Sequence, residues 1–147
     1  MNGYNGTAYE VENFEGKGFL DVAFTQEEQA KILETTVDNS AETTYSPLNQ
    51  YACENTNDKI YLMSESEMKK TDYGYKNDQD RMRKGTDYAI ARRLCVNSIS
   101  KNGDYWTRSP TSVYSSGASY VYDDGSLSSN GVDYDYFGVL PALKIFK

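Results

Sequence analysis

Tyr105-Trp106-Thr107-Arg108-Ser109-Pro110 is the stretch that decides the fold class of this chain. Its aromatic and β-branched residues predict a strand that the proline ends. A second β segment follows from Ala118 to Ser129, around Asp123-Asp124-Gly125. We therefore expect a β-rich half over residues 105–147, preceded by a helix-bearing scaffold over residues 1–104.

The register of the 118–129 hairpin decides which side chains face the core. A three-residue turn with Gly125 in the left-handed conformation pairs Val121 with Leu127 on one face. The other face, which we expect to point out of the domain, then carries Tyr120, Tyr122, Ser126 and Ser128. A two-residue turn would mix apolar and polar residues on both faces, so the three-residue turn is favoured.

Short helices are predicted upstream of this half. Thr25 and Glu28 have the spacing of a capping box and predict a helix over about 26–36. Ser64 and Glu67 repeat the pattern, for a short helix to about Lys70. A third helix is expected over 86–94.

The remaining segments are expected to be strands or loops. Residues 1–24 should form an irregular segment packed on the core through Phe14, Phe19, Leu20, Val22 and Phe24. Asp58–Met63 should be a strand, and residues 37–57 and 71–85 polar loops, the latter solvated. The last strand should run from Val139 to Phe146, with Val139, Leu143 and Ile145 on one side.

Composition limits the functions that the chain can have. Its 147 residues suit a single domain, and no apolar run is long enough to span a membrane as a helix. A net charge of −7 disfavours nucleic acids and anionic membranes as partners. The chain has no histidine, which excludes Ser-His, Cys-His and His-metal chemistry. Cys53 and Cys95 are expected to be free, half-buried thiols.

The window from Ser109 to Leu143 has an unusual composition. It contains no Lys, Arg, Glu, Gln, Met or Trp, but five tyrosines and eight serines. Tyrosine supplies large, stiff contact area, and Ser, Gly and Asn supply adaptable hydrogen bonds. A catalytic centre instead needs titratable groups tuned by their neighbours. The window is therefore typical of a recognition surface.

Three features in this half have a structural and a functional interpretation. Trp106 on an alternating strand is expected in the core and not in a ligand platform. Arg108 is expected to tie loops together through buried hydrogen bonds. Asp123-Asp124-Gly125 and Asp133-Tyr134-Asp135 suggest calcium, but Asp-Gly turns are far commoner than shaped calcium sites. We therefore expect no metal and no cofactor.

The motifs of the second half, taken in order, resemble those of a bacterial and phage family. Tyr105–Pro110 and Gly138-Val139-Leu140-Pro141-Ala142-Leu143 are similar to the W-W-L-R-S-P and G-V-R-P-A-L motifs of domains of the DUF6273 type. The resemblance covers most of the chain from about Asn2. It implies a C-type-lectin-like α+β fold, also used by formylglycine-generating enzymes, with short helices around a small twisted antiparallel sheet.

The chain departs from the family pattern at three places. Thr107 stands where the family usually has Leu, and Leu140 stands where it usually has Arg. Because the chain opens at Met1-Asn2-Gly3, we also expect the usual N-terminal hairpin before a W-L-N-G-like stretch to be missing. The enzymes with this fold need cysteines in the C-terminal core, and no cysteine follows Cys95. The resemblance thus implies a protein without enzymatic activity.

A narrower resemblance is to the variable region of proteins diversified by diversity-generating retroelements. Those systems mutate adenines at Asn codons, and the products exclude Lys, Glu, Gln, Met and Trp. The window lacks all five types, which make up 29 of the 147 residues. Strand and loop segments rich in Ser, Gly and Asn are also poor in these types, so an undiversified relative would show the same gap.

We expect a non-enzymatic protein that binds a macromolecular ligand, a protein or a glycan, through its C-terminal half. If the resemblance holds, the protein is displayed on a phage particle or a bacterial surface. Two other functions fit: an undiversified structural or cell-surface module, and a calcium-dependent lectin. The expected ligand-binding residues are Thr107, Ser112, Tyr114, Ser115, Tyr120, Tyr122, Asp123, Ser126, Ser128, Tyr134, Asp135, Tyr136, Phe137 and Leu140.

Overall fold

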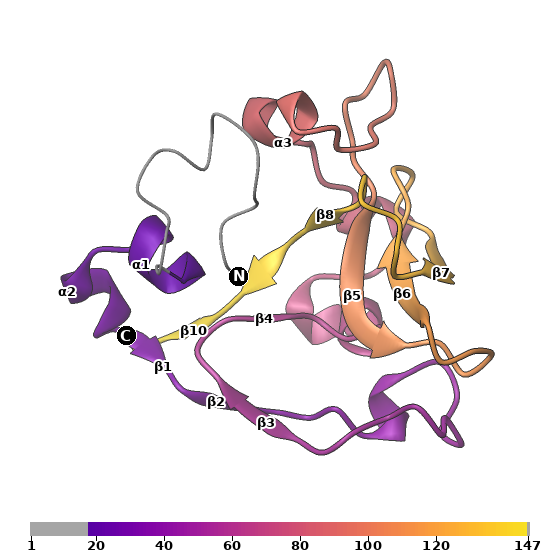
Figure 1. Ribbon diagram of the computed structural model, residues 1–147, viewed down its shortest axis with the longest axis horizontal. Helices are drawn as coiled ribbons and strands as arrows, with labels where there is room; N and C mark the ends of the chain where they lie inside the picture. The colour runs from indigo at the N-terminus through magenta and orange to yellow at the C-terminus, as the bar shows by residue number, and fades with distance from the viewer. Residues whose placement is uncertain (1–17, 147) are drawn as a thin grey trace.

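The computed structural model describes residues 18–146, which form an α+β arrangement of short elements (Figure 1). The helices are α1 (Phe19–Ala23), α2 (Gln26–Gln29) and α3 (Asp87–Ala91), with 3₁₀ turns η1 (Ala41–Thr43), η2 (Glu67–Lys69), η3 (Thr71–Tyr73) and η4 (Asp78–Arg81). The strands are β1 (Ile32–Leu33), β2 (Thr35–Val37), β3 (Thr56–Asp58), β4 (Tyr61–Leu62), β5 (Tyr105–Pro110), β6 (Gly117–Val121), β7 (Leu127–Gly131), β8 (Gly138–Val139), β9 (Pro141–Ala142) and β10 (Lys144–Ile145).

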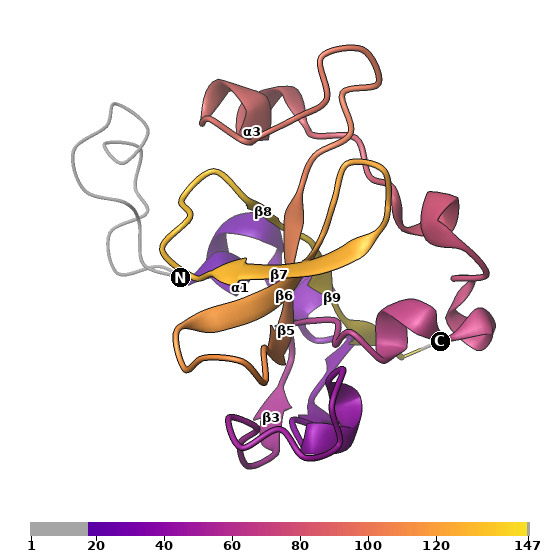
Figure 2. The same ribbon diagram turned by 90° about the vertical axis from the view of Figure 1, so that its right-hand side faces the viewer.

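The largest sheet has four strands in the order β7-β6-β5-β8, and three two-stranded sheets accompany it. The strand pairs β1-β10, β2-β3 and β4-β9 are antiparallel. β8 runs parallel to β5, which differs from the purely antiparallel sheet expected from the sequence. In Figure 1, α1 and α2 lie on the side of the molecule away from β5, β6 and β7. Figure 2 shows β7 at the edge of the sheet.

The hairpin of β6 and β7 has the predicted register. Val121 pairs with Leu127, and Tyr120 pairs with Ser128. The turn is closed by the Tyr122 amide, which donates to the Ser126 carbonyl at 2.9 Å. Gly125 has a φ of 85°, the left-handed conformation that a three-residue turn requires at this position.

The two faces of β5 have different environments. Tyr105, Thr107 and Ser109 are buried, and the alternate residues are half-buried. Tyr105 and Val121 lie opposite each other and join Met68 and Tyr75 in the hydrophobic core. Trp106 therefore lies on the other face, and the expectation that it belongs to the core is wrong: it is half-buried and contacts other rings.

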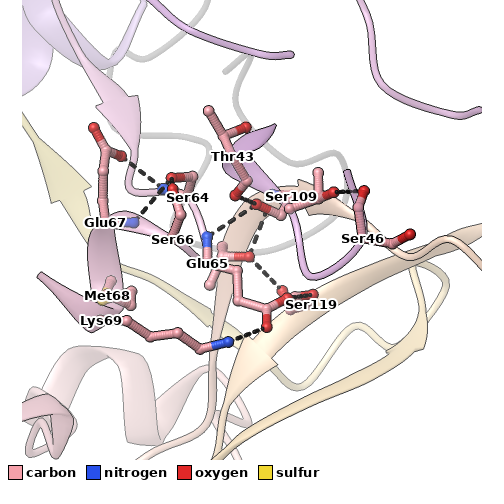
Figure 3. Close-up of polar contacts among 12 residues, drawn as sticks. Thr43, Ser46, Ser64, Glu65, Ser66, Glu67, Met68, Lys69, Ser109 and Ser119 are labelled. Atoms are coloured by element: carbon pink, nitrogen blue, oxygen red, sulfur yellow. Dashed lines mark hydrogen bonds and ion pairs between the residues drawn. The ribbon is translucent and has the colours of Figure 1, made fainter. Parts of the chain in front are cut away.

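Polar side chains occupy much of the interior beneath β5, as Figure 3 shows. The Ser109 hydroxyl donates to the Thr43 carbonyl at 3.0 Å and accepts from the Glu65 amide at 2.9 Å. The Glu65 carboxylate is buried, accepts from the Ser119 hydroxyl at 2.7 Å, and forms an ion pair with Lys69 at 2.8 Å. Each of these buried groups thus keeps a partner, as burial of polar atoms requires.

Two arginines connect segments that are distant in the sequence. Arg108 pairs with Glu67 and donates to the carbonyls of Leu62 and Asp38, at 2.8 Å and 3.0 Å. Its predicted role of tying loops together is confirmed. Burial raises the pKa of Glu67, but hydrogen bonds from Arg108 and Ser64 outweigh burial and lower it.

Arg81 contradicts the expectation of a solvated loop over residues 71–85. It is buried and donates to the Gly125 carbonyl at 2.7 Å and to the Met68 carbonyl at 3.1 Å. It also pairs with Asp78. Because one planar guanidinium reaches all three groups, it fixes the hairpin turn against η2 and η4.

The predicted helix over 26–36 is too long. Thr25 and Glu28 do form the capping box, but α2 ends at Gln29. Ile32 and Thr35 instead belong to strands that pair with residues near Ile145 and Asp58. Pairing with distant strands overrides the local helical pattern, which the β-branched run Thr35–Val37 already weakens.

The last predicted strand is divided into three. β8, β9 and β10 pair with β5, β4 and β1 respectively, so the segment crosses from one sheet to the next. Pro141 lacks an N–H and exposes its side chain, and Val139 and Ile145 are also exposed. The 58–63 strand is likewise interrupted, because residues 59–60 bend between β3 and β4.

Two smaller expectations also changed. Phe19, Leu20 and Val22 lie in a helix, α1, and not in an irregular segment. Cys53 and Cys95 are free as expected, but both are exposed. The expectations for Phe14 and for the missing N-terminal hairpin concern residues 1–17, which lie outside the described residues.

Between residues 18 and 146, no helix is long and apolar enough to cross a membrane.

Replacing Gly125 by alanine tests the link between the turn and η4. A Cβ atom at Gly125 would lie 1.8 Å from the Asp78 carbonyl oxygen, and the φ of 85° disfavours any other residue. We expect Gly125→Ala to lower the free energy of unfolding by about 3 kcal/mol or more. Chemical denaturation measures this loss.

The matched control is Gly74→Ala. Gly74 has a φ of 92°, but a Cβ atom there meets nothing within 4 Å. This variant carries only the left-handed penalty of about 1–2 kcal/mol. Equal losses in the two variants would show that contact with η4 does not constrain the turn.

In the Tyr105→Phe variant, we expect the free energy of unfolding to fall less steeply at alkaline pH than in the unmodified protein. Burial raises the pKa of Tyr105 from 10 to about 12, and its hydroxyl donates to the Arg81 carbonyl at 2.6 Å. The unfolded chain loses this proton first, so the stabilisation is complete below pH 10 and is lost as the pH rises towards 12. The loss amounts to roughly 2 kcal/mol by pH 12.

Urea denaturation of both proteins between pH 9 and 12 measures the difference. At pH 7, Tyr105→Phe is expected to be less stable by about 1 kcal/mol because the hydrogen bond is lost. This difference between the free energies of unfolding of the two proteins should close above pH 10. A gap that stays constant over the whole range would contradict the assignment.

Candidate functional site

Six aromatic side chains form one contact network on the outer face of the four-stranded sheet, which we call the ring cluster. Phe137 is at its centre, with ring centroids 4.4 Å from Tyr120, 4.8 Å from Trp106 and 5.1 Å from Tyr136. The Tyr134 ring stacks on Phe137 at 5.9 Å. The Tyr122 ring contacts Tyr120 at 4.8 Å. The members are Trp106, Tyr120, Tyr122, Tyr134, Tyr136 and Phe137.

Strand pairing and one loop bring these rings together. Trp106 and Tyr120 lie opposite each other on β5 and β6, so both point to the outer face. The loop over residues 132–137, between β7 and β8, brings its three rings against them. Backbone hydrogen bonds hold both ends of the loop: Val132 donates to Ser116 at 2.9 Å, and Cys95 donates to Tyr136 at 2.7 Å.

The side chains of the ring cluster fall into two groups by solvent exposure. The buried and half-buried ones form its floor, and the exposed ones form its surface. Tyr120 is 2% exposed, whereas Tyr122 is 42% and Tyr134 37% exposed. Trp106, Tyr136 and Phe137 are half-buried. Tyr120 lies on the outer face of the sheet as expected, but the expectation that it is exposed there is wrong, because the Phe137 ring covers it. Tyr120 supports the surface, and Tyr122 and Tyr134 are available for direct contact.

Two further predicted site residues, Thr107 and Leu140, also point into the interior of the domain. Thr107 is 3% exposed, and its hydroxyl donates to the Ser119 carbonyl at 2.9 Å. Leu140 is half-buried and packs against the hydrophobic core. Both residues depart from the family pattern, but their side chains contribute to the scaffold and not to the exposed surface.

The serines and the tyrosine of the β5–β6 connection lie at one end of the hairpin. Tyr114 and Ser115 are exposed, and Ser112 is half-buried. The Tyr114 ring lies over Gly117, where a Cβ atom would meet it at 2.5 Å. Gly117 pairs with Gly131, and the Tyr134 ring lies near Gly131, so both rings are at the same end of the hairpin.

The hairpin turn forms the opposite end. Asp124 is exposed, and its carboxylate accepts from the Ser126 amide at 2.9 Å. The Ser126 side chain and amide lower the pKa of Asp124, so this carboxylate is ionised at neutral pH. Asp123 and Ser126 are half-buried, and Ser128 is exposed on β7.

Buried titratable groups lie beneath the surface. Burial raises the pKa of Asp104, and the carboxylates of Asp123 and Asp124 raise it further, whereas the Asp123 amide and Cys95 lower it. Burial also raises the pKa of Tyr120, with the Tyr122 side chain adding to the effect. Both effects follow from the low polarity around these groups.

A cavity of about 500 Å³ adjoins the ring cluster on the side of α3. Its wall includes Tyr136 and Phe137 but neither Tyr122 nor Tyr134. Phe19 of α1 also lines it, and the basic residues in its lining are Arg83, Lys84 and Arg92. The lining also includes Asp135, so the cavity opens beside the ring cluster and shares Asp135 and Tyr136 with its edge.

Tyr134 and Tyr136 lie in the connection between β7 and β8 and not on a strand. The segment is a turn, in which the two tyrosine rings contact each other at 5.1 Å and Asp133 and Asp135 are exposed. Over residues 18–146, no three acidic or cysteine side chains group in a way that could hold a metal ion. What this surface offers chemically is ring faces, hydroxyls and carboxylates for recognition.

Trp106 and Arg81 were not predicted as parts of this site. Trp106 packs edge-on against Tyr120 at 5.9 Å and so belongs to the floor. Its pairing with Tyr120 follows from the hairpin register and could have indicated this. Arg81 holds the turn that carries Asp123 and Asp124, but its polar neighbours in the sequence give no sign of burial.

A family model described as "Domain of unknown function (DUF6273)" matches residues 4–147. The chain therefore belongs to this family. No curated protein and no solved structure matches the chain. The family description assigns no activity, so a function has to be argued from the geometry of the ring cluster.

Replacing single rings distinguishes the floor from the surface. We expect Phe137→Ala to lower the free energy of unfolding by about 2–3 kcal/mol, because four rings lose their common neighbour. Tyr134→Ala removes a ring that is 37% exposed and should cost about 1 kcal/mol or less. Denaturant titration compares the two variants, and a costlier Tyr134→Ala would contradict this division.

Proposed function

We propose that this protein is a non-enzymatic ligand-binding protein that presents the exposed part of the ring cluster to a macromolecular partner. The observation that carries this proposal is the position of Tyr122 and Tyr134. Both rings are more than one third exposed, although they contact a network of buried and half-buried rings. A rigid aromatic side chain that stays exposed loses little conformational entropy when a partner binds.

The scaffold supports the same function. The interior face of β5 and β6 is fixed by buried hydrogen bonds, and Arg81 fixes the hairpin turn. Exposed side chains on a backbone held in this way can change without loss of the fold. The residues that we propose for direct contact are Tyr114, Ser115, Tyr122, Asp123, Ser126, Ser128, Tyr134, Asp135 and Tyr136.

We further propose that the fold is C-type-lectin-like. Short helices around a small sheet are consistent with this fold, in which the terminal strands normally pair. The pairing of β1 with β10 supports the proposal, because these are the first and last strands of residues 18–146. A protein of this type is displayed on a phage particle or a bacterial surface.

The composition of residues 109–143 favours diversification by a retroelement. The exposed positions of the proposed contact set are Tyr, Ser and Asp, which adenine mutagenesis of Asn codons produces. Diversified positions should be exposed, and Tyr122, Ser128 and Tyr134 meet this condition. The buried Thr107 and Tyr120 do not, so we leave them out of the diversified set.

Sequencing of the locus tests diversification. We expect a reverse-transcriptase gene nearby and an imperfect repeat of the segment encoding residues 109–143. The repeat should differ from the gene at adenines only, and the differing codons should encode exposed residues. A locus without such a repeat would contradict diversification, and differences concentrated at codons of buried residues such as Tyr120 would contradict the structural assignment.

A further inference from the structure

We propose that the exposed part of the ring cluster binds a cationic segment of a protein partner, in which Arg or Lys side chains stack on Tyr122 and Tyr134. This inference rests on the proposed function and adds the chemical class of the ligand. Its basis is the combination of exposed ring faces with carboxylates that have no cationic partner in the described part of the chain.

Carboxylates flank both exposed rings. Asp123 and Asp124 directly follow Tyr122, and Asp133 and Asp135 stand on either side of Tyr134. Asp124, Asp133 and Asp135 are exposed. The ion pairs formed within residues 18–146 involve Glu65, Asp78 and Glu67, and none of these four aspartates.

The hairpin and the 132–137 loop carry no cations of their own, although Arg83, Lys84 and Arg92 line the cavity that Asp135 also lines. The chain has no Lys or Arg between Ser109 and Leu143, so neither the hairpin nor the 132–137 loop can neutralise its own carboxylates. Four negative charges beside exposed rings produce a negative potential there. Such a potential attracts a cationic partner and disfavours an acidic one.

The rest of the fold already uses the interaction that we propose for the partner. Lys69 lies 5.3 Å from the centre of the Tyr45 ring, and Arg83 lies 5.8 Å from that of Tyr75. In residues 18–146, no Lys or Arg lies over Tyr122 or Tyr134 in this way. Within the described part of the chain, no cation thus occupies a face of either exposed ring, and such a face can accept one from a partner.

Other occupants fit this surface less well. A second copy of the chain carries the same net charge of −7 and would bring carboxylates against carboxylates. A nucleic acid is repelled for the same reason. A neutral glycan can stack on tyrosines but leaves the carboxylates without counter-charges. A cationic protein segment satisfies both the rings and the carboxylates.

The geometry also indicates which rings the cations meet. The cavity next to Tyr136 is lined by three basic side chains, Arg83, Lys84 and Arg92, and two acidic ones, Asp104 and Asp135, so its excess of basic groups disfavours a further cation. Tyr122 and Tyr134 do not line that cavity. We therefore expect the contact at these two rings, on the side away from α3.

The first experiment is a selection of short random peptides on the folded protein, with counter-selection against the double variant Tyr122→Ser/Tyr134→Ser. We expect the selected peptides to be enriched in Arg and Lys. Peptides that depend on the two tyrosines but are not enriched in cations would overturn this inference and leave the proposed function standing. If no peptide depends on them, both are overturned.

The second experiment measures the charge contribution directly by calorimetry. A selected Arg-containing peptide is compared with the same peptide carrying citrulline, which keeps the shape of Arg without its charge. We expect the Arg peptide to bind about tenfold more tightly. Asp133→Asn/Asp135→Asn should weaken its binding by about fivefold or more.

The matched control is Glu27→Gln/Glu42→Gln, which removes the same charge at exposed positions in α2 and η1. This variant should change the affinity by less than about twofold, since remote exposed charges are screened by salt. Equal weakening in the two double variants would show a response to net charge only, and would overturn the inference. Equal affinities of the Arg and citrulline peptides would also overturn it.

Discussion

The pairing of β5 with β6 places Tyr105 opposite Val121 and Trp106 opposite Tyr120, and the architecture of the site depends on this register. One member of each consecutive pair enters the core and the other enters the ring cluster, because side chains alternate across a strand. A shift by one residue would bury Trp106 and expose Tyr105. The same two strands therefore determine both the interior and the ring cluster that we propose as the recognition surface.

Buried polar contacts hold this strand pair in place where apolar contacts are few. Only seven apolar or aromatic side chains in residues 18–146 are buried, among them Val121 and Met68. Ser109, Ser119 and Glu65 form hydrogen bonds with directional geometry, which favours one arrangement of β5 and β6 over its neighbours. Arg81 adds the same kind of constraint at the hairpin turn. The recognition surface that we propose needs a backbone of this rigidity.

The sequence predicted the parts of the fold that local rules control. The bounds of β5, the hairpin register and the capping box at Thr25 and Glu28 follow from alternation, turn geometry and capping. The end of α2 and the division of the last strand could not be predicted in this way. Both depend on pairing between segments far apart in the chain, such as Ile32 with Ile145.

Composition indicated which aromatic side chains form the candidate site, but it did not indicate how deeply each one is buried. The window from Ser109 to Leu143 indicated the rings, and the register placed Tyr120 and Tyr122 on one face. Only the tertiary structure shows that the Phe137 ring covers Tyr120 and leaves Tyr122 exposed. The burial of Thr107 and Arg81 was likewise hidden, because their partners belong to other elements.

The most direct test of the proposed recognition surface is an NMR titration of the folded protein with a peptide selected for binding to it. The spectra show which tyrosine ring signals shift. We expect the signals of Tyr122 and Tyr134 to move most, while those of the buried Tyr75 and Tyr105 stay unchanged. Shifts confined to residues around α3 and its cavity, with Tyr122 and Tyr134 unaffected, would contradict a recognition role for the ring cluster.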